Sequence, residues 1–202
     1  MPGTIWGEKV GIRLLRPGDA GALERFISDP DVANLLFEEL DSDIPSPLLM
    51  GAIIVLQRLQ GSPDYGIVEP GGRLVGSVRL WRISEKNRSA MLTIFIGDKS
   101  RWGQGYGTEA LRLILRHAFG QMRLNRVELH VFDFNARAIR SYEKAGFVRE
   151  GVRRHALRRG TRYYDIVVMG ILKEEFETLE AQRERKDSPH GGENTHMIAP
   201  GT

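Results

Sequence analysis

The chain has 202 residues, enough for one domain with a substantial core. Its 29 lysine and arginine residues against 26 aspartate and glutamate residues give a formal net charge of +3, too small a basic excess to indicate a nucleic-acid partner. The absence of cysteine excludes disulfides, thiolate metal sites and a cysteine acyl-enzyme. The longest apolar run, residues 47–56, is too short to span a bilayer, and the N-terminus has no signal-peptide pattern. We therefore expect a cytoplasmic protein without a membrane partner.

The first quarter of the chain predicts a strand, a helix and a loop. Residues 10–16 alternate in polarity as a strand does, and Asp19 offers an N-cap for a helix that ends at Ile27. Residues 28–46 are rich in acidic residues and proline, which favours a loop with at most one helical turn. This loop is either simply solvated or recognises a cationic substrate through four acidic side chains: Glu38, Glu39, Asp41 and Asp43.

The next segments predict a helix and an antiparallel hairpin. Residues 47–59 form the helix, and the spacing of its apolar residues turns Leu49, Ile53, Leu56 and Leu59 toward the core. Residues 65–69 and 73–83 are two strands joined by the turn sequence Pro70-Gly71-Gly72. Residues 90–97 form a further strand whose two faces are both apolar, so we expect it in the middle of the sheet.

A glycine-rich loop follows that strand. Gly103, Gly105 and Gly107 precede an amphipathic helix that continues to Met122, so backbone N–H groups and the positive end of the helix dipole meet at one place. This arrangement predicts a site for a phosphate or pyrophosphate. The loop lacks the lysine of a P-loop and the spacing of a dinucleotide fingerprint, which argues against ATP and NAD. His117 is expected on the surface of the helix.

The last third predicts a strand, a helix and a hairpin. Residues 126–132 form the strand, Asn135 caps the helix, and Gly146 ends it in a left-handed conformation. Residues 147–157 and 161–172 form a hairpin in which Arg149 to Arg162 is rich in arginine, either as a solvated face or as a contact for an acidic or phosphate group. Residues 173–182 suggest a final helix. The polar residues 183–202 suggest a flexible tail.

Together these elements predict one α/β domain, residues 1–182, built on a sheet of mixed strand direction. The strand, glycine loop, helix and strand in the middle of the chain form a right-handed crossover, which predicts one parallel strand pair. The remaining pairs are hairpins and therefore antiparallel.

Two motifs carry a resemblance to a known family. Arg101-Trp-Gly-Gln-Gly-Tyr-Gly-Thr-Glu-Ala110 and Asn135-Ala-Arg-Ala-Ile-Arg-Ser-Tyr-Glu-Lys-Ala-Gly-Phe147 occur in the order found in GCN5-related N-acetyltransferases, and the chain resembles especially their ribosomal-protein-alanine and polyamine acetyltransferase branch. The resemblance spans residues 10–172. It implies a GNAT fold: a mixed, mostly antiparallel sheet of about seven strands with a splayed parallel pair, flanked by about four helices.

The resemblance also implies how acetyl-CoA would be held. The loop Trp102–Gly107 would bind the pyrophosphate through backbone amides, although Trp102 departs from the glutamine or arginine usual there, and Arg101 would add a charge. The strand would pair with the pantetheine arm, and Asn135 would bond the pantetheine or adenine side. The implied cofactor-binding residues are Phe95, Ile96, Arg101, Trp102, Gly103, Gln104, Gly105, Tyr106, Gly107, Thr108 and Asn135.

For the chemistry, Tyr142 matches the family tyrosine that can protonate the departing thiolate, and a backbone N–H near Ile96 would stabilise the oxyanion. Glu128, on the same strand face as His130, is the favoured base, and Asp165 is a second candidate. Tyr142 could also be only a core aromatic residue, and Asn135 only a helix cap. No metal is expected.

The predicted function is therefore transfer of an acetyl group from acetyl-CoA to a primary amine, on a small molecule or a protein N-terminus, by direct attack in a ternary complex. A non-catalytic acyl-CoA sensor on the same fold and a nucleotide-phosphate binding module are the alternatives. We expect a monomer or homodimer.

Overall fold

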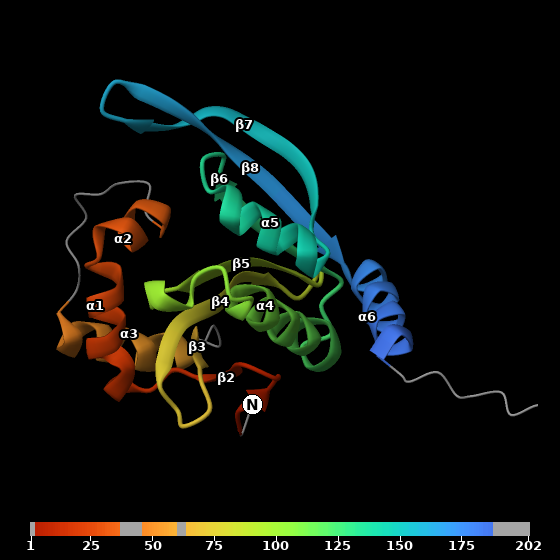
Figure 1. Ribbon diagram of the computed structural model, residues 1–202, viewed down its shortest axis with the longest axis horizontal. Coiled ribbons are helices and arrows are strands. Elements are labelled where there is room, and N and C mark those ends of the chain that lie inside the picture. Colours follow the sequence, from red (N-terminus) through yellow and green to blue (C-terminus); the bar gives the residue numbers. More distant parts are fainter. Residues whose placement is uncertain (1–2, 37–45, 60–63, 188–202) are drawn as a thin grey trace, which may run out of the picture.

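A single sheet organises the computed structural model, which describes residues 3–36, 46–59 and 64–187 (Figure 1). Within these residues the sheet has eight strands in the order β1-β2-β3-β4-β5-β6-β8-β7. The strands are β1 (Ile5–Trp6), β2 (Gly11–Leu14), β3 (Asp64–Val68), β4 (Leu74–Ser84), β5 (Ser89–Ile96), β6 (Arg126–Phe132), β7 (Val148–Arg159) and β8 (Arg162–Leu172). The mixed α/β class is confirmed, with β1 as the strand that was not expected, because two residues are too few to show an alternating pattern.

The parallel pair lies at the centre of the sheet, as predicted. β5 pairs with β6 at three positions, the last of which joins Met91 to Glu128. Beyond this point β5 continues to Ile96 and β6 to Phe132 without pairing to each other, so the two strands part. All other neighbours in the sheet are antiparallel. The gap between β5 and β6 is where the functional groups gather.

Six α-helices flank the sheet in the described part of the chain: α1 (Ala20–Ile27), α2 (Pro30–Leu36), α3 (Pro47–Leu59), α4 (Tyr106–Arg116), α5 (Ala136–Ala145) and α6 (Lys173–Asp187). Figure 1 shows α1, α2 and α3 grouped at one end of the molecule, while α4 and α5 lie beside each other against the central strands. None of these helices is both long and apolar enough to cross a bilayer.

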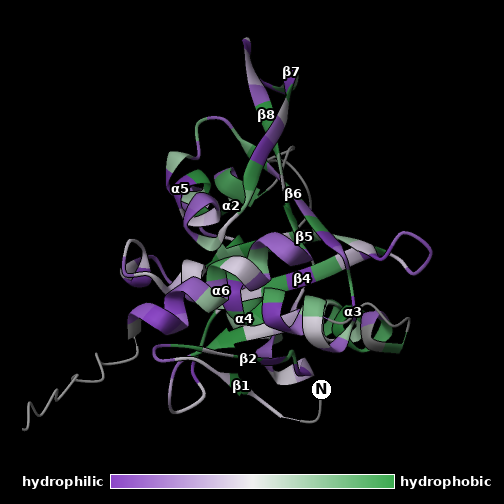
Figure 2. Ribbon diagram, turned by 90° about the vertical axis from the view of Figure 1, so that its right-hand side faces the viewer, coloured by the Kyte–Doolittle hydropathy of each residue, from purple (hydrophilic) through white to green (hydrophobic). Residues whose placement is uncertain are grey.

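The β7–β8 hairpin extends beyond the rest of the sheet in both views, and Arg159 near its tip donates to the Asn34 carbonyl oxygen of α2 at 2.8 Å (Figures 1 and 2). Most of β7 is exposed, including the half-exposed Val148 and Val152, and the hydropathy colouring marks hydrophilic stretches along the hairpin. The solvated-face interpretation of the arginine-rich segment fits this exposure.

The N-terminal helices differ from the prediction in two respects. The segment expected as a loop begins with α2, two turns long, because Pro30 suits the first helical position and Val32 becomes buried. Asp19 occupies the N-cap position of α1 as predicted, but its side chain makes no capping bond there. Its carboxylate accepts bonds from Arg13 at 2.7 and 2.9 Å and from the Arg16 N–H at 2.7 Å.

The buried face of α3 was also wrongly predicted, although its bounds were correct. Leu49, Leu56 and Leu59 are 54%, 54% and 79% exposed, whereas Ile54 is 4% exposed. This helix is apolar on nearly every side, so hydrophobic spacing alone does not select the face that packs.

The terminal helix α6 continues to Asp187, five residues past its expected end, because its side chains bond to the body. Glu180 accepts bonds from Arg112 and Arg116 of α4, and Arg183 donates to the Lys144 carbonyl oxygen at 2.5 Å. Arg183 is therefore part of an ordered helix rather than the start of a tail, and residues 188–202 lie outside the described residues.

His117 is buried rather than on the surface. It lies in a π-helical turn, His117–Gln121, that follows α4, and its side chain contacts the Tyr65 hydroxyl at 3.2 Å and Gln121 at 2.9 Å. The sequence concealed this because Tyr65 is far away in the chain. Burial lowers the pKa of His117, and the Gln121 bond only partly offsets this.

We predict that His117 makes the fold sensitive to acid. The unfolded chain takes up the histidine proton near pH 6.5 and the native protein only at lower pH, so stability is lost as pH falls below about 6.5, by at most ~1.4 kcal/mol per pH unit. Urea unfolding at pH 7.5 and 5.5 should show a smaller loss in His117→Gln than in the unchanged protein. An equal loss would contradict this. Burial raises the pKa of Asp64 to about 6, which changes stability with pH in the opposite direction. This contribution is the same in both proteins and cancels in the comparison.

Candidate active site

The parting of β5 and β6 opens a cavity of about 550 Å³. It is lined from the helix side by residues of α4 and α5, and from the other side of the sheet by residues of α2 and β4. Ten of the eleven expected cofactor residues line it: Phe95, Ile96, Arg101, Trp102, Gly103, Gly105, Tyr106, Gly107, Thr108 and Asn135. Gln104 does not, because its amide turns away and donates to the Ser100 carbonyl at 2.6 Å.

The glycine loop has the form of an anion site. Gly103 and Gly105 have φ values of 75° and 88°, which other residues rarely adopt, and Gly105 occupies the N-cap of α4. Within the described residues, no acceptor bonds the six successive backbone N–H groups from Gly103 to Thr108. Six free amides at the N-terminus of a helix can hold a diphosphate.

The free edge of β5 faces the same cavity. The Gly97 N–H bonds the Val75 carbonyl of β4, and antiparallel pairing alternates, so Phe95 also turns its backbone toward β4. The intervening residues Ile94 and Ile96 therefore turn their N–H and C=O groups toward the gap. Of the two strand residues proposed to pair with pantetheine, the geometry favours Ile96.

α5 carries Asn135 and Tyr142 into position. Asn135 caps the helix as predicted, since its Oδ1 accepts from the Ala138 N–H at 3.2 Å, and Gly146 ends the helix with φ 108°. Tyr142 lines the cavity while only 8% exposed, and its ring packs edge-on against Phe147. Burial raises its pKa to about 12, so the phenol keeps its proton at neutral pH. No described residue bonds to its hydroxyl, which leaves the hydroxyl for a ligand.

On the opposite side of the gap, the structure separates Glu128 from the cavity. Glu128 bonds Arg126 at 2.7 Å and faces His130 Nε2 at 3.3 Å, and only His130 lines the cavity. Arg126 is held in turn by Glu150 at 2.5 Å, and the two carboxylates raise its pKa above its ordinary value. This chain of ion pairs orients the imidazole toward the cavity.

Asp165, the second candidate base, does not line the cavity. Its carboxylate accepts a 2.8 Å bond from the His155 N–H, where β7 bulges and His155 takes a φ of 52°. This bond supports the hairpin rather than the cavity. The acidic residues Glu38 to Asp43 lie outside the described residues. Among the residues that the structure does describe, no cluster of side chains is suited to hold a metal ion.

Comparisons with known proteins agree with this geometry. The family model described as Acetyltransferase (GNAT) domain matches residues 9–148. The chain belongs to the GNAT acetyltransferase family. It is an acetyl-CoA-dependent N-acetyltransferase, and nothing in the comparisons supports a non-catalytic sensor.

Several proteins that are similar to this acetyltransferase are named N-acetyltransferases. It is 39% identical over 127 residues to the probable N-acetyltransferase YjcK of Bacillus subtilis, covering 60% of this chain and 68% of that one. It is 31% identical to the putative ribosomal N-acetyltransferase YdaF of the same organism, over 84% and 94% of the two chains. The fold matches the spermidine N-acetyltransferase of Vibrio cholerae in complex with CoA and spermine with a TM-score of 0.75, at 24% identity over 85% of this chain and 99% of that one.

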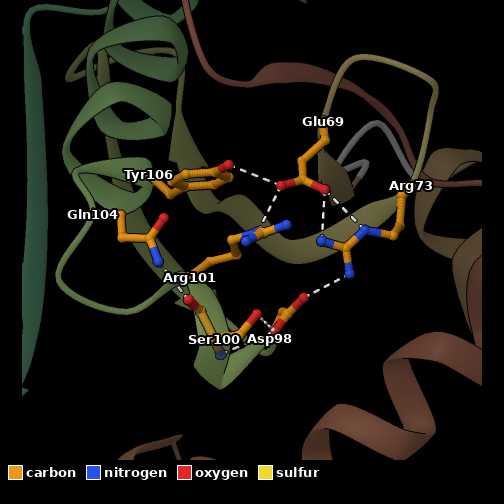
Figure 3. Close-up of polar contacts among 7 residues, drawn as sticks. All are labelled: Glu69, Arg73, Asp98, Ser100, Arg101, Gln104 and Tyr106. Carbon is orange, nitrogen blue, oxygen red and sulfur yellow. Dashed lines mark hydrogen bonds and ion pairs between the residues drawn. The ribbon is translucent and has the colours of Figure 1, made fainter.

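Glu69 holds the glycine loop of the acetyltransferase in place (Figure 3). Its carboxylate accepts bonds from Arg101 at 2.7 Å, the Tyr106 hydroxyl at 2.8 Å and Arg73 at 2.6 to 2.8 Å, and Arg73 also reaches Asp98 at 2.7 Å. Burial raises the pKa of Glu69, but these bonds outweigh it and keep the pKa below its ordinary value. Arg101 thus supports the loop, and its charge is already shared with a carboxylate. Sequence reasoning missed Glu69 because this residue lies directly after β3, 32 residues before Arg101 in the chain.

Arg137 is a second residue that the sequence did not reveal. Its guanidinium lies 3.6 Å from the centre of the Trp102 ring, while the Trp102 indole donates to the Ile96 carbonyl at 2.7 Å. The tryptophan that departs from the family pattern therefore positions a cation from α5 at the cavity wall. Arg140 and Lys144 also line the cavity, so the cofactor side is positively charged and suits phosphate groups.

Proposed function

We propose that this acetyltransferase acetylates a primary amine by direct attack in a ternary complex, with acetyl-CoA on the α4 and α5 side of the sheet and the amine on the α2 side. The observation that carries the proposal is the continuous cavity through the gap between β5 and β6. It joins the free loop amides, the Tyr142 hydroxyl and the His130 imidazole. Two substrates can meet there only from opposite faces of the sheet.

The cofactor half of the proposal uses backbone groups. The amides from Gly103 to Thr108 hold the diphosphate and Arg137 adds charge. The N–H groups of Ile94 and Ile96 and the C=O group of Ile94 bond the amide-bearing arm, since the Ile96 carbonyl already accepts from the Trp102 indole. An N–H group on this same edge lies where the carbonyl oxygen gains charge during attack. Bound acetyl-CoA would supply the activated acetyl thioester.

We assign the role of general base to His130 instead of Glu128. An ammonium ion must lose a proton before its nitrogen lone pair can form the bond to the carbonyl carbon, and His130 lines the cavity where this nitrogen would stand. Glu128 is then a positioning residue that orients the ring and stabilises the imidazolium formed.

Tyr142 acts at the other end of the reaction. As the carbon–sulfur bond breaks, the sulfur gains the electron pair and needs a hydrogen-bond donor. A phenol with a pKa of about 12 is a weaker acid than a thiol with a pKa of about 8.5, so donation of a hydrogen bond to the developing charge is its main contribution. The ammonium ion gives up two protons in all: His130 takes one and returns it to solvent, and the other ends on the sulfur. The electron pair of the broken carbon–sulfur bond stays on the sulfur, so the products are an amide and a thiol.

Replacing Tyr142 by Phe tests the donor role. We expect kcat to fall about 100-fold or more, because the sulfur loses its donor, while KM for acetyl-CoA changes by less than about twofold. Thiol release from acetyl-CoA measures both constants. Tyr163→Phe, on the exposed part of the hairpin, is the matched control and should retain full activity. An unchanged kcat in Tyr142→Phe removes this residue from the reaction.

Replacing His130 by Gln tests the base. The variant should lose about 100-fold in kcat/KM for the amine at neutral pH, and the acidic limb of its pH profile should flatten. Glu128→Gln should keep that limb with a smaller loss, and His155→Gln, on the hairpin, should behave as the unchanged enzyme. If Glu128→Gln flattens the limb and His130→Gln does not, the carboxylate is the base.

A further inference from the structure

On the amine side of the gap, one face of the sheet continues from β6 across β8 to β7. Successive side chains of a strand point to opposite faces, and every second residue of β6 and β8 belongs to the core with α4 and α5. The residues between them, including His130 and Phe132 of β6, therefore face the amine side. The residues turned into the core are Val127, Leu129, Val131, Val167, Met169 and Ile171.

A first row of residues crosses this face from His130. It pairs with Val168 of β8, and Val168 pairs with Gly151 of β7, so the three positions share the amine side. Neighbouring strands lie about 4.8 Å apart, which places the backbone of Gly151 roughly 10 Å from that of His130. A Cβ added at Gly151 would meet no atom of the described residues within 4 Å. An acceptor that extends from His130 across β8 therefore enters open space above Gly151.

A second row runs beside the first and ends at an arginine. Ile166, which lines the cavity, pairs with Phe132 on one side and with Arg153 on the other. Arg153 follows Gly151 by two residues, about 7 Å along β7, and it is exposed. Its long side chain can therefore turn over the open space while its charge stays in water.

Ion pairs close the other side of the first row. Glu150 of β7 reaches across β8 to Arg126 of β6, and the pair lies over Gly170, where an added Cβ would collide with both side chains. Glu128 shares the same guanidinium. Two carboxylates against one guanidinium give this cluster a net negative charge beside the His130 imidazole. An ammonium group is therefore attracted to the start of the row, and an anionic group to the opposite side, where Arg153 lies.

The direction toward the tip of the hairpin is occupied by the protein itself. Arg159 donates to the Asn34 carbonyl oxygen of α2 at 2.8 Å, and its guanidinium lies 5.2 Å from the centre of the Phe132 ring. These contacts join the hairpin to α2 over the end of β6. An acceptor longer than the cavity therefore leaves it across β8.

We infer that the acceptor is an amine that also carries an anionic group, about 10 Å from the reacting nitrogen, and that Arg153 binds this group. The inference rests on the proposed function and names the substrate class for the same site. The ammonium group arrives beside Glu128 and loses its proton to His130, while the body of the acceptor crosses Val168 and Gly151. A long ω-amino acid and an acidic peptide are two sources of this chemistry.

Two matched pairs of acceptors test the inference and distinguish these sources. 8-Aminooctanoate and 8-aminooctanamide differ only in the charge at the far end, as do the C-terminal amides of Gly-Gly-Asp and Gly-Gly-Asn. In the thiol-release assay we expect kcat/KM for the acid to exceed that for its neutral partner by about fivefold in at least one pair, and this advantage to shrink as salt is added. The pair that is used faster identifies the source.

Equal use of acid and neutral acceptor in both pairs overturns the inference but keeps the proposed function, because amines are still acetylated. Turnover of spermidine or hexylamine without turnover of either acid has the same meaning. Absence of turnover on all six amines overturns both.

Removing the charge of Arg153 should remove the preference. In Arg153→Gln the ratio of kcat/KM for the acid to that for the neutral acceptor should fall to about one. Arg158→Gln is the matched control, because Leu157 packs with Ile166 on the amine side and the next residue of β7 points the other way. Each variant is compared with itself on two acceptors, so a loss of folded protein does not alter the ratio. An unchanged ratio in Arg153→Gln overturns the assignment.

Filling the space above Gly151 tests the path of the acceptor. Gly151 has no left-handed φ and no described atom within 4 Å of an added Cβ, so valine fits the strand there. Gly151→Val should lower kcat/KM for 8-aminooctanoate relative to that for propylamine by about tenfold. Gly18→Val, at an equally open position before α1, should leave this ratio unchanged. An unchanged ratio in Gly151→Val contradicts the path across β8.

Discussion

The parting of β5 and β6 after the Met91–Glu128 pair is the constraint on which the site depends. Backbone N–H and C=O groups inside a protein need partners, and a strand edge that faces a cavity leaves them without any. Here Ile94 and Ile96 present such an edge, and the Trp102 indole satisfies only one carbonyl. In the proposed function, an extended, amide-bearing molecule supplies the missing partners in the gap. A closed sheet with the same strands would have neither the cavity nor a passage between its faces.

The surrounding residues hold this open geometry in place. Glu69 fixes the glycine loop through Arg101 and Tyr106, and the Glu150–Arg126–Glu128 chain fixes His130. Both clusters consist of the chain's own side chains, so the amides and the imidazole are oriented by the protein itself. Preorganised groups of this kind lower the barrier because they need no rearrangement as charge develops. In the proposed function, the loop anchors the cofactor, and the two strands and α5 carry the groups that act in the reaction.

Features set by local chemistry could be predicted from the sequence. Asn135 and Gly146 delimit α5 through short-range bonds, and Gly103 and Gly105 form their turn because few other residues adopt a φ near 80°. Residues whose role depends on distant partners could not. Glu69 acquires its role from Arg101, Arg137 from Trp102, and His117 from Tyr65, contacts that spacing along the chain does not encode. The same limit explains why Glu128 was favoured over His130, since alternation places both on one face and only the tertiary structure shows which reaches the cavity.

We propose that the loop amides anchor acetyl-CoA at one side of the opened sheet. Backbone amide resonances measured during a titration with CoA test it directly, with pantetheine, which lacks the phosphates, as the comparison. CoA is expected to shift the amides of Gly103 to Thr108 and those of Ile94 and Ile96, whereas pantetheine should shift only the latter pair. Loop amides that stay unmoved at saturating CoA would contradict it.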